Sequence, residues 1–177
     1  MKSTKSASRF ATALLELAIE RNSVDKVASD LKYLLEVNQE TKEFQILLKS
    51  PVINSTKKIE IFNELFNDFE ELTTLFIQLV TNKRREYMLA EIAFSFDALL
   101  KAKKGITPVT LISAVTLDAS TKETILNKIK PLVKGELELT ETIDESLGGG
   151  FIIRMDDKQI DASIASQFNN LKQRLTR

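Results

Sequence analysis

Apolar residues in the first hundred positions recur with helical spacing, interrupted by short polar breaks. This pattern predicts six helices, at about residues 8–21, 24–40, 41–48, 55–66, 68–82 and 85–104. The third helix is expected to stop at Ser50-Pro51, because proline disfavours helix in the residue before it. Ser55 and Asp68 are placed to cap the fourth and fifth helices. Six short helices with tight connections predict a helical bundle.

After Lys104 the pattern changes to short strand-forming runs around one helix. Residues 107–115 are rich in β-branched side chains, and Leu137 and Leu139 alternate with polar neighbours. A helix capped by Ser120 or Thr121 is expected between these runs, and a buried strand is expected at 151–153. The final helix is expected to bury one apolar stripe, formed by Ile164, Phe168, Leu171 and Leu175.

The sequence therefore predicts a mainly α protein of two domains. Residues 1–104 form an N-terminal six-helix bundle, and residues 105–177 form a small C-terminal α/β domain. The start of the chain is basic and rich in Ser and Thr, as in a transit peptide. The apolar pattern that begins at Phe10 instead favours the first helix of the fold.

Two of the predicted helices carry more apolar surface than packing on one core requires. An amphipathic helix needs an apolar stripe only somewhat wider than ~100°. In the first helix the polar residues crowd into about 80°, and in the fifth the apolar residues spread over about 200°. Periodicity alone favours two central helices covered by their neighbours. The alternative is that both helices flank an exposed groove for a partner helix.

If the groove exists, its candidate contacts lie on these two helices. They are Ala13, Leu14 and Leu17 on the first helix and Phe76, Leu79 and Val80 on the fifth. Some of the six must face the core of the bundle, and periodicity does not say which.

The amino-acid composition limits the classes of function that the chain can have. The chain has 177 residues, with 25 basic and 25 acidic side chains, no His and no Cys. The balanced charge argues against a nucleic-acid binder and favours a protein partner. Without imidazole or thiol groups, the usual catalytic triads and the metal sites built on His or Cys cannot form. We therefore expect no catalytic residue, metal, cofactor or small-molecule substrate. No apolar run approaches the ~20 residues of a membrane span.

The run Gly148-Gly149-Gly150 resembles a phosphate loop only superficially. A phosphate loop needs Gly-Lys-Ser/Thr leading into a helix, whereas here the run precedes the strand at Phe151. Gly148 and Gly149 are better explained by a turn that requires positive φ. Asp161 or Ser163 is expected to cap the final helix, and the two are not expected to form a catalytic pair.

Four segments resemble the delta subunit family of F-type ATP synthases, which is homologous to the mitochondrial oligomycin-sensitivity-conferring protein. SRFATALLELA resembles the opening helix of the family, and LLKSPVINSTKKIEIFNELF resembles its leucine pair, proline and Lys-containing helix. LVTNKRREYMLAEIAFSFDALL resembles its Asn-x-Arg segment and sixth helix. The most specific is IDESLGGGFIIRMDDKQIDASIASQFNNLKQRL, which is similar to its Gly-Gly, strand, acidic turn and Ile-Asp-x-Ser.

The resemblance implies a non-catalytic stator subunit in the peripheral stalk. It implies that the N-terminal domain holds the N-terminal helix of an alpha subunit of the catalytic head, between its first and fifth helices. It also implies that the C-terminal domain joins the C-terminal ends of b-type stalk subunits. The expected location is the cytoplasmic side of a bacterial plasma membrane, peripheral to it. The resemblance thus reverses the preference that periodicity gave for central helices.

Two other readings of the residues remain open at this stage. A general helical adaptor would use the same groove for a different amphipathic helix. A small hydrolase built on Ser, Asp and Lys is the third class. Co-purification separates them, because a stator brings ATP synthase subunits with it and an enzyme turns over alone.

Overall fold

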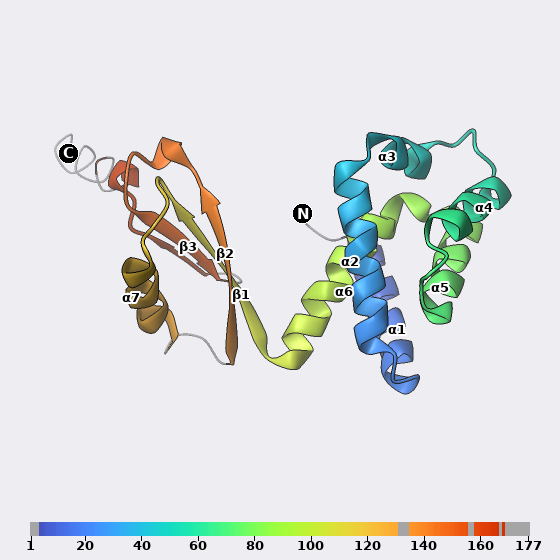
Figure 1. Cartoon of the computed structure of the whole chain (residues 1–177), viewed down its shortest axis with the longest axis horizontal. Helices are drawn as coiled ribbons and strands as arrows, with labels where there is room; N and C mark the ends of the chain where they lie inside the picture. The colour runs from blue at the N-terminus through green and yellow to red at the C-terminus, as the bar shows by residue number, and fades with distance from the viewer. Residues whose placement is uncertain (1–3, 131–134, 156–157, 167, 169–177) are drawn as a thin grey trace. The chain divides into compact units, whose positions relative to one another are not determined.

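The computed structural model describes residues 4–130, 135–155, 158–166 and 168 (Figure 1). The chain divides into two compact units, residues 1–100 and 101–177. The division falls inside helix α6 (Leu89–Lys104), close to the boundary expected at Lys104. The prediction of a mainly helical chain with a small C-terminal α/β region is confirmed. No helix among the described residues is both long and apolar enough to cross a membrane.

Unit 1 consists of helices joined by short turns. They are α1 (Lys5–Glu20), α2 (Val24–Glu40), α3 (Lys42–Lys49), α4 (Ser55–Leu65), α5 (Glu71–Asn82), the 3-10 turn η1 (Glu86–Met88) and α6. Their inward faces form one apolar core in which Ala11, Leu14 and Val80 are completely buried. Small side chains at Ala7, Ala11 and Ala18 leave room for neighbouring helices to approach α1.

The predicted caps of α4 and α5 are wrong. Asn54 is the N-cap of α4, so Ser55 is its first helical residue. Glu70 is the N-cap of α5, and Asp68 lies outside the helix. The cap of α5 comes instead from α2, because the Asp30 carboxylate accepts hydrogen bonds from Glu70 N at 2.9 Å and Thr73 Oγ1 at 2.7 Å. Such a cap from another helix satisfies free amides but leaves no local sequence signal.

A buried lysine ties three segments of unit 1 together. The Lys58 side chain on α4 is 1% exposed and pairs with Glu86 of η1, with 2.6 Å between Nζ and Oε1. Lys58 Nζ also donates to the carbonyl oxygens of Ser50 at 2.7 Å and Leu48 at 3.4 Å. A buried ammonium needs such partners, because an unpaired charge in the interior is very costly. The end of α3, the α3–α4 loop and η1 are therefore fixed to α4.

Unit 2 is a four-stranded sheet with the strand order β2-β1-β3-β4. The strands are β1 (Ile106–Ser113), β2 (Glu136–Ile143), β3 (Phe151–Met155) and β4 (Lys158–Asp161). Strands β1 and β2 are parallel, joined through α7 (Ala119–Ile129), and the other pairs are antiparallel. Helix α7 packs Ile125 and Ile129 on Val109 and Leu111 of β1. A short 3-10 turn, η3 (Glu145–Leu147), leads into the glycine run.

Three predictions for unit 2 need correction. The cap of α7 is Asp118, which accepts from Thr121 N at 3.2 Å, rather than Ser120 or Thr121. Strand β4 was not predicted. Ile164 and Phe168 are 55% and 69% exposed, so the expected burial of these two side chains is wrong. Leu171 and Leu175, the rest of that stripe, lie outside the described residues.

The Lys58–Glu86 pair yields a stability prediction. Glu86→Ala leaves the buried ammonium without its counter-charge and should lower the free energy of unfolding by about 3–5 kcal/mol. Lys58→Met combined with Glu86→Leu removes both charges and should cost clearly less. Urea denaturation measures both. Lys57→Met, at the exposed neighbouring lysine, is the control and should stay within about 0.5 kcal/mol. Equal losses for Glu86→Ala and the double variant would contradict the pairing argument.

Candidate partner-binding site

Helix α1 presents apolar side chains on two sides. Its core face is fully packed, with Ala11, Leu14 and Ala18 at 0% exposure. Leu17 is 43% exposed, Ala13 is exposed, and Phe10 is half-buried. Phe10, Ala13 and Leu17 stand three and four positions apart, so they lie along one flank of the helix, beside the core face. This flank forms the part of the apolar arc of the first helix that exceeds what packing on one core requires.

Helix α5 has a matching flank. Leu75 and Leu79 are one turn apart and are 47% and 50% exposed. Leu72 and Phe76 lie between them and the core, at 6% and 9% exposure. The apolar surface of α5 therefore continues from the core out to solvent without a polar break.

The two flanks adjoin at an aromatic contact. The rings of Phe10 and Phe76 meet edge to face, with 6.3 Å between their centroids. The guanidinium carbon of Arg85 lies 5.9 Å from the Phe10 centroid, a cation–π arrangement. We call the surface formed by Phe10, Ala13, Leu17, Leu75 and Leu79 the α1–α5 groove. Phe10 contacts Phe76, which belongs to the core, where the two flanks adjoin.

The six predicted contacts divide evenly between groove and core. Ala13, Leu17 and Leu79 are exposed on the groove. Leu14 and Val80 are completely buried and Phe76 is 9% exposed. Burial thus separates the three exposed candidates from the three that pack in the core, since a side chain within the core cannot offer surface to a partner. Phe10 and Leu75 were not among the predicted contacts, although both fall within the wide apolar arcs.

Both ends of α5 are anchored, which holds the groove in shape. At its start, Asp30 accepts from Glu70 N and Thr73 Oγ1, and Lys26 pairs with Glu70 at 3.0 Å. At its end, Arg84 has the left-handed φ of +55°, and Glu86 of η1 pairs with Lys58. Helix α1 begins at Thr4, whose hydroxyl accepts from Ala7 N and donates to Glu91 of α6.

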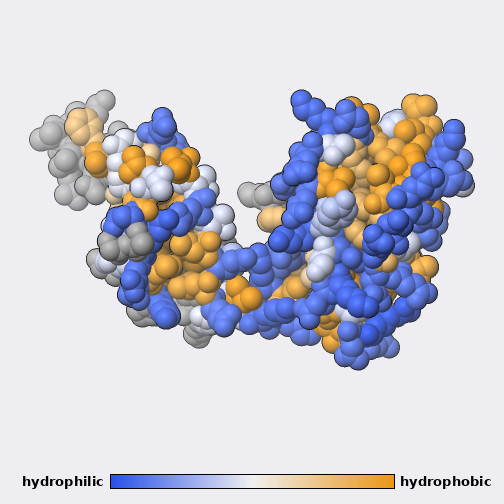
Figure 2. Space-filling model, in the orientation of Figure 1, coloured by the Kyte–Doolittle hydropathy of each residue, from blue (hydrophilic) through white to orange (hydrophobic). Residues whose placement is uncertain are grey.

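Other apolar side chains also reach the surface of unit 1. Figure 2 shows apolar surface over α3 and α4, where Ile46, Val52 and Leu65 are 67%, 89% and 48% exposed. Scattered exposed apolar residues are normal on soluble proteins. They supply matched controls for the groove, because they share its exposure but not its position.

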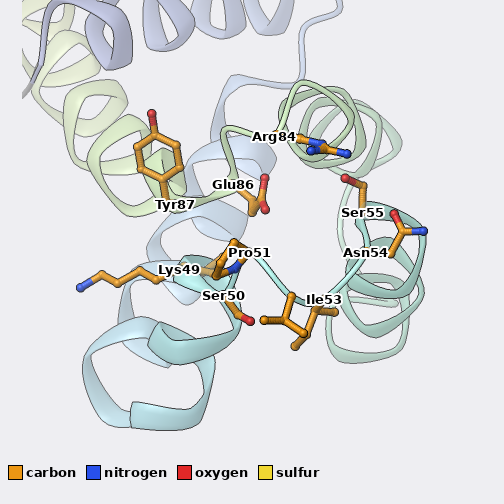
Figure 3. Close-up of a pocket in the computed structure, with 11 residues that line it drawn as sticks. Lys49, Ser50, Pro51, Ile53, Asn54, Ser55, Arg84, Glu86 and Tyr87 are labelled. Atoms are coloured by element: carbon orange, nitrogen blue, oxygen red, sulfur yellow. The ribbon is translucent and has the colours of Figure 1, made fainter.

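A polar pocket lies beside the buried ion pair (Figure 3). It has a volume of about 420 Å³ and is lined by the segment 48–55 together with Arg84, Glu86 and Tyr87. Glu86 Oε2 is buried here and has no hydrogen-bond donor among the residues that the structure describes. None of the predicted site residues lines this pocket. Within the described part of the chain, no cluster of three acidic side chains is placed to hold a metal ion.

In unit 2, the predicted glycine and Asp-Ser motifs pack on each other. Gly148 and Gly149 have φ of +65° and +145°, and Ala162 N donates to Phe151 O at 2.9 Å. Asp161 accepts from Ser163 N and Oγ and from Ser166 Oγ, and Ser163 Oγ accepts from Ser166 N. These hydrogen bonds, that from the Ser166 hydroxyl first, lower the pKa of Asp161. The motifs thus form a structural turn that begins the last helical segment.

Comparison with known proteins gives consistent matches over the chain. The model of the ATP synthase delta (OSCP) subunit family matches residues 7–175. The ATP synthase delta subunit of Chlorobaculum tepidum is 34% identical over 176 residues, which cover 99% of this chain and 97% of that protein. That of Carboxydothermus hydrogenoformans is 34% identical, covering 97% of each. A chain of the Toxoplasma gondii mitochondrial ATP synthase hexamer shares the fold, with a TM-score of 0.78 at 23% identity, covering 98% of this chain and 99% of that chain.

These matches show which class of protein the chain belongs to. The chain is a non-catalytic component of the peripheral stalk of an F-type ATP synthase. It belongs to the ATP synthase delta (OSCP) subunit family, as the resemblance of its four segments implied. The hydrolase reading of the sequence is thereby set aside.

The glycine turn yields a prediction for unit 2. A Cβ on Gly150 would lie 2.3 Å from Ala162 O, whereas one on Gly148 meets no atom within 4 Å. Gly148→Ala should therefore cost only the left-handed backbone penalty, about 1–2 kcal/mol. Gly150→Ala must also push two backbone segments apart and should cost more. Hydrogen exchange of the β1 and β3 amides measures the stability of unit 2. Equal losses for the two variants would contradict this close packing.

Proposed function

We propose that unit 1 is a six-helix bundle whose α1–α5 groove binds the N-terminal helix of an alpha subunit of the catalytic head. The observation that carries this proposal is the pair of exposed apolar flanks, with Leu17, Leu75 and Leu79 each 43–50% exposed beside a completed core. An amphipathic helix laid along them would bury its own apolar stripe, at ~25 cal/mol per Å² less the costs of ordering.

Unit 2 is proposed to bind the C-terminal ends of the b-type stalk subunits. Its support is local: Ile164 and Phe168 expose apolar side chains on the segment that follows the Asp161 turn. With the head on one unit and the stalk on the other, the chain would resist rotor torque through interface area rather than chemistry. The bacterial relatives favour the cytoplasmic face of a plasma membrane as the location, peripheral to the membrane through the complex.

The head interface is tested by separating binding from folding. Leu17→Asp and Leu79→Asp should weaken binding of an alpha-subunit N-terminal peptide about tenfold or more, because a buried carboxylate is costly. Both variants should keep their thermal midpoints. Leu14→Asp and Val80→Asp place the charge in the core and should unfold unit 1 instead. Leu65→Asp on α4, with 48% exposure against 50% for Leu79, is the matched control.

Calorimetry with the full chain and this peptide measures the affinity, and circular dichroism measures the midpoint. Binding should show a negative heat-capacity change, the mark of apolar burial. A peptide that ignores the intact chain, or binds Leu79→Asp as tightly as Leu65→Asp, would show that the groove is not the head interface.

The stalk interface has its own matched pair within unit 2. Phe168 and Val115 are 69% and 66% exposed, so neither substitution by Asp should disturb the core. Phe168→Asp should reduce capture of purified b-type C-terminal fragments, while Val115→Asp should leave it unchanged. Pulldown from purified components measures both. Undiminished capture by Phe168→Asp would remove this segment from the proposed interface.

A further inference from the structure

The polar pocket beside the buried ion pair has two unlike ends (Figure 3). Its volume of about 420 Å³ is within the range of sites that hold small molecules. At one end, the Glu86 side chain is nine-tenths buried, and its Oε2 has no hydrogen-bond donor among the described residues. At the other end lie Arg84 and the start of α4. The two ends therefore require opposite chemical groups.

The buried carboxylate oxygen of Glu86 requires a donor. Its partner Lys58 already donates to Oε1 of Glu86 and to the carbonyl oxygens of Ser50 and Leu48. An ammonium group has three donors, so Lys58 has none left for Oε2. A buried carboxylate oxygen without a donor is costly. A donor bound in the pocket beside Glu86 would remove this cost.

The start of α4 lacks acceptors. Its N-cap, Asn54, makes no side-chain cap hydrogen bond, and the first bond of the helix runs from Lys58 N to Asn54 O at 3.0 Å. The amides of residues 55–57 thus have no acceptor within the described part of the chain. Arg84 lies beside them in the lining, and no ion pair between described residues involves it. Free amides, a helix dipole and a guanidinium together favour a carboxylate.

We propose that this pocket binds a free α-amino acid, whose ammonium donates to Glu86 Oε2 and whose carboxylate lies against Arg84 and the start of α4. Figure 3 shows the Glu86 carboxylate turned toward the side on which Arg84 and Ser55 lie. An α-amino acid carries the two required charges on one carbon and has no net charge. Its carboxylate offsets Arg84, and its ammonium shares the carboxylate of Glu86 with Lys58. The site is separate from the α1–α5 groove, none of whose residues lines the pocket.

The lining also favours one kind of ligand side chain. Pro51, Val52 and Ile53 of the α3–α4 loop supply apolar surface, and Val52 is 89% exposed. An aliphatic side chain on the ligand would cover part of this surface and gain affinity in proportion to the area buried. The ligand is therefore an aliphatic amino acid. Once bound, it would connect the α3–α4 loop and the start of α4 to η1.

A titration with L-leucine tests the site. The full chain, labelled with nitrogen-15, is titrated while its amide signals are recorded. The amides of residues 52–57 and 84–87 should shift together with a dissociation constant of about 1 mM, the range expected for so few atoms. The thermal midpoint should rise with the concentration of L-leucine. Absence of shifts in these segments, or shifts scattered over the surface, would overturn the site and leave a pocket that holds water only.

Two analogues of L-leucine test which groups are recognised. 4-Methylpentanoate lacks the ammonium, and 3-methylbutylamine lacks the carboxylate. Each should bind about tenfold more weakly than L-leucine, because each loses the charged hydrogen bonds of one end. These changes lie in the ligand, so they leave the fold of the protein unaltered. An analogue that binds as tightly as L-leucine would overturn the recognition of both groups.

Arg84→Asn tests the carboxylate end from the side of the protein. Arg84 has the left-handed φ of +55°, which Asn adopts readily, so the variant should fold. Its affinity for L-leucine should fall about tenfold, whereas its affinity for 3-methylbutylamine should stay unchanged. Lys57→Gln, which removes an exposed charge outside the lining, is the control and should bind L-leucine as the native chain does. Equal losses for the two variants, or none for Arg84→Asn, would contradict the role of Arg84.

Discussion

The arrangement of unit 1 depends on one buried ammonium group. Lys58 Nζ takes oxygens from the end of α3, from the following loop and from Glu86. A charge in the interior requires these partners, so the end of α3, the loop after it and η1 must meet at α4. Glu86 directly follows Arg85, whose guanidinium lies over Phe10. The ion pair thereby fixes the end of α5 against α1 and contributes to the shape of the groove.

The groove itself arises because the apolar surface of α1 and of α5 extends beyond the face that packs in the core. Leu14 and Leu17 are three positions apart, yet one is fully buried and the other is 43% exposed. The same holds for Phe76 and Leu79 on α5. A stripe of ordinary width would end at the core. The apolar surface beyond that stripe remains in solvent, where it adds nothing to the stability of the isolated chain. Contact with a second apolar partner would remove this surface from water.

Much of the fold follows from the local sequence pattern. The parts that this pattern does not predict depend on contacts between residues distant in the chain. Helical spacing located α1 to α6 of unit 1, though not the 3-10 turn η1, because that signal lies within each segment. The cap of α5 was missed because Asp30 reaches α5 from another helix. The wide arcs identified the two groove helices, but only packing separates Leu79 from Val80. Strand β4 was missed and Ile164 was predicted buried, since short strands and terminal segments depend on tertiary context.

Helix α1 carries charged residues at positions that reduce its own stability. Its cap at Thr4 and its alanine-rich core face both favour the helix, yet Lys5, Arg9, Glu16 and Glu20 stand at the ends where its dipole disfavours them. In a sequence that is otherwise consistent across levels, such a violation marks a site under a second constraint. These charges are unfavourable for α1 by itself, but their order in space matches the order of the charges at the ends of α5 beside it. The constraint therefore concerns the two helices together and the surface that they share. The apolar excess and the charge order of α1 thus both lie on the side of the helix that faces this shared surface and not in its packing on the core.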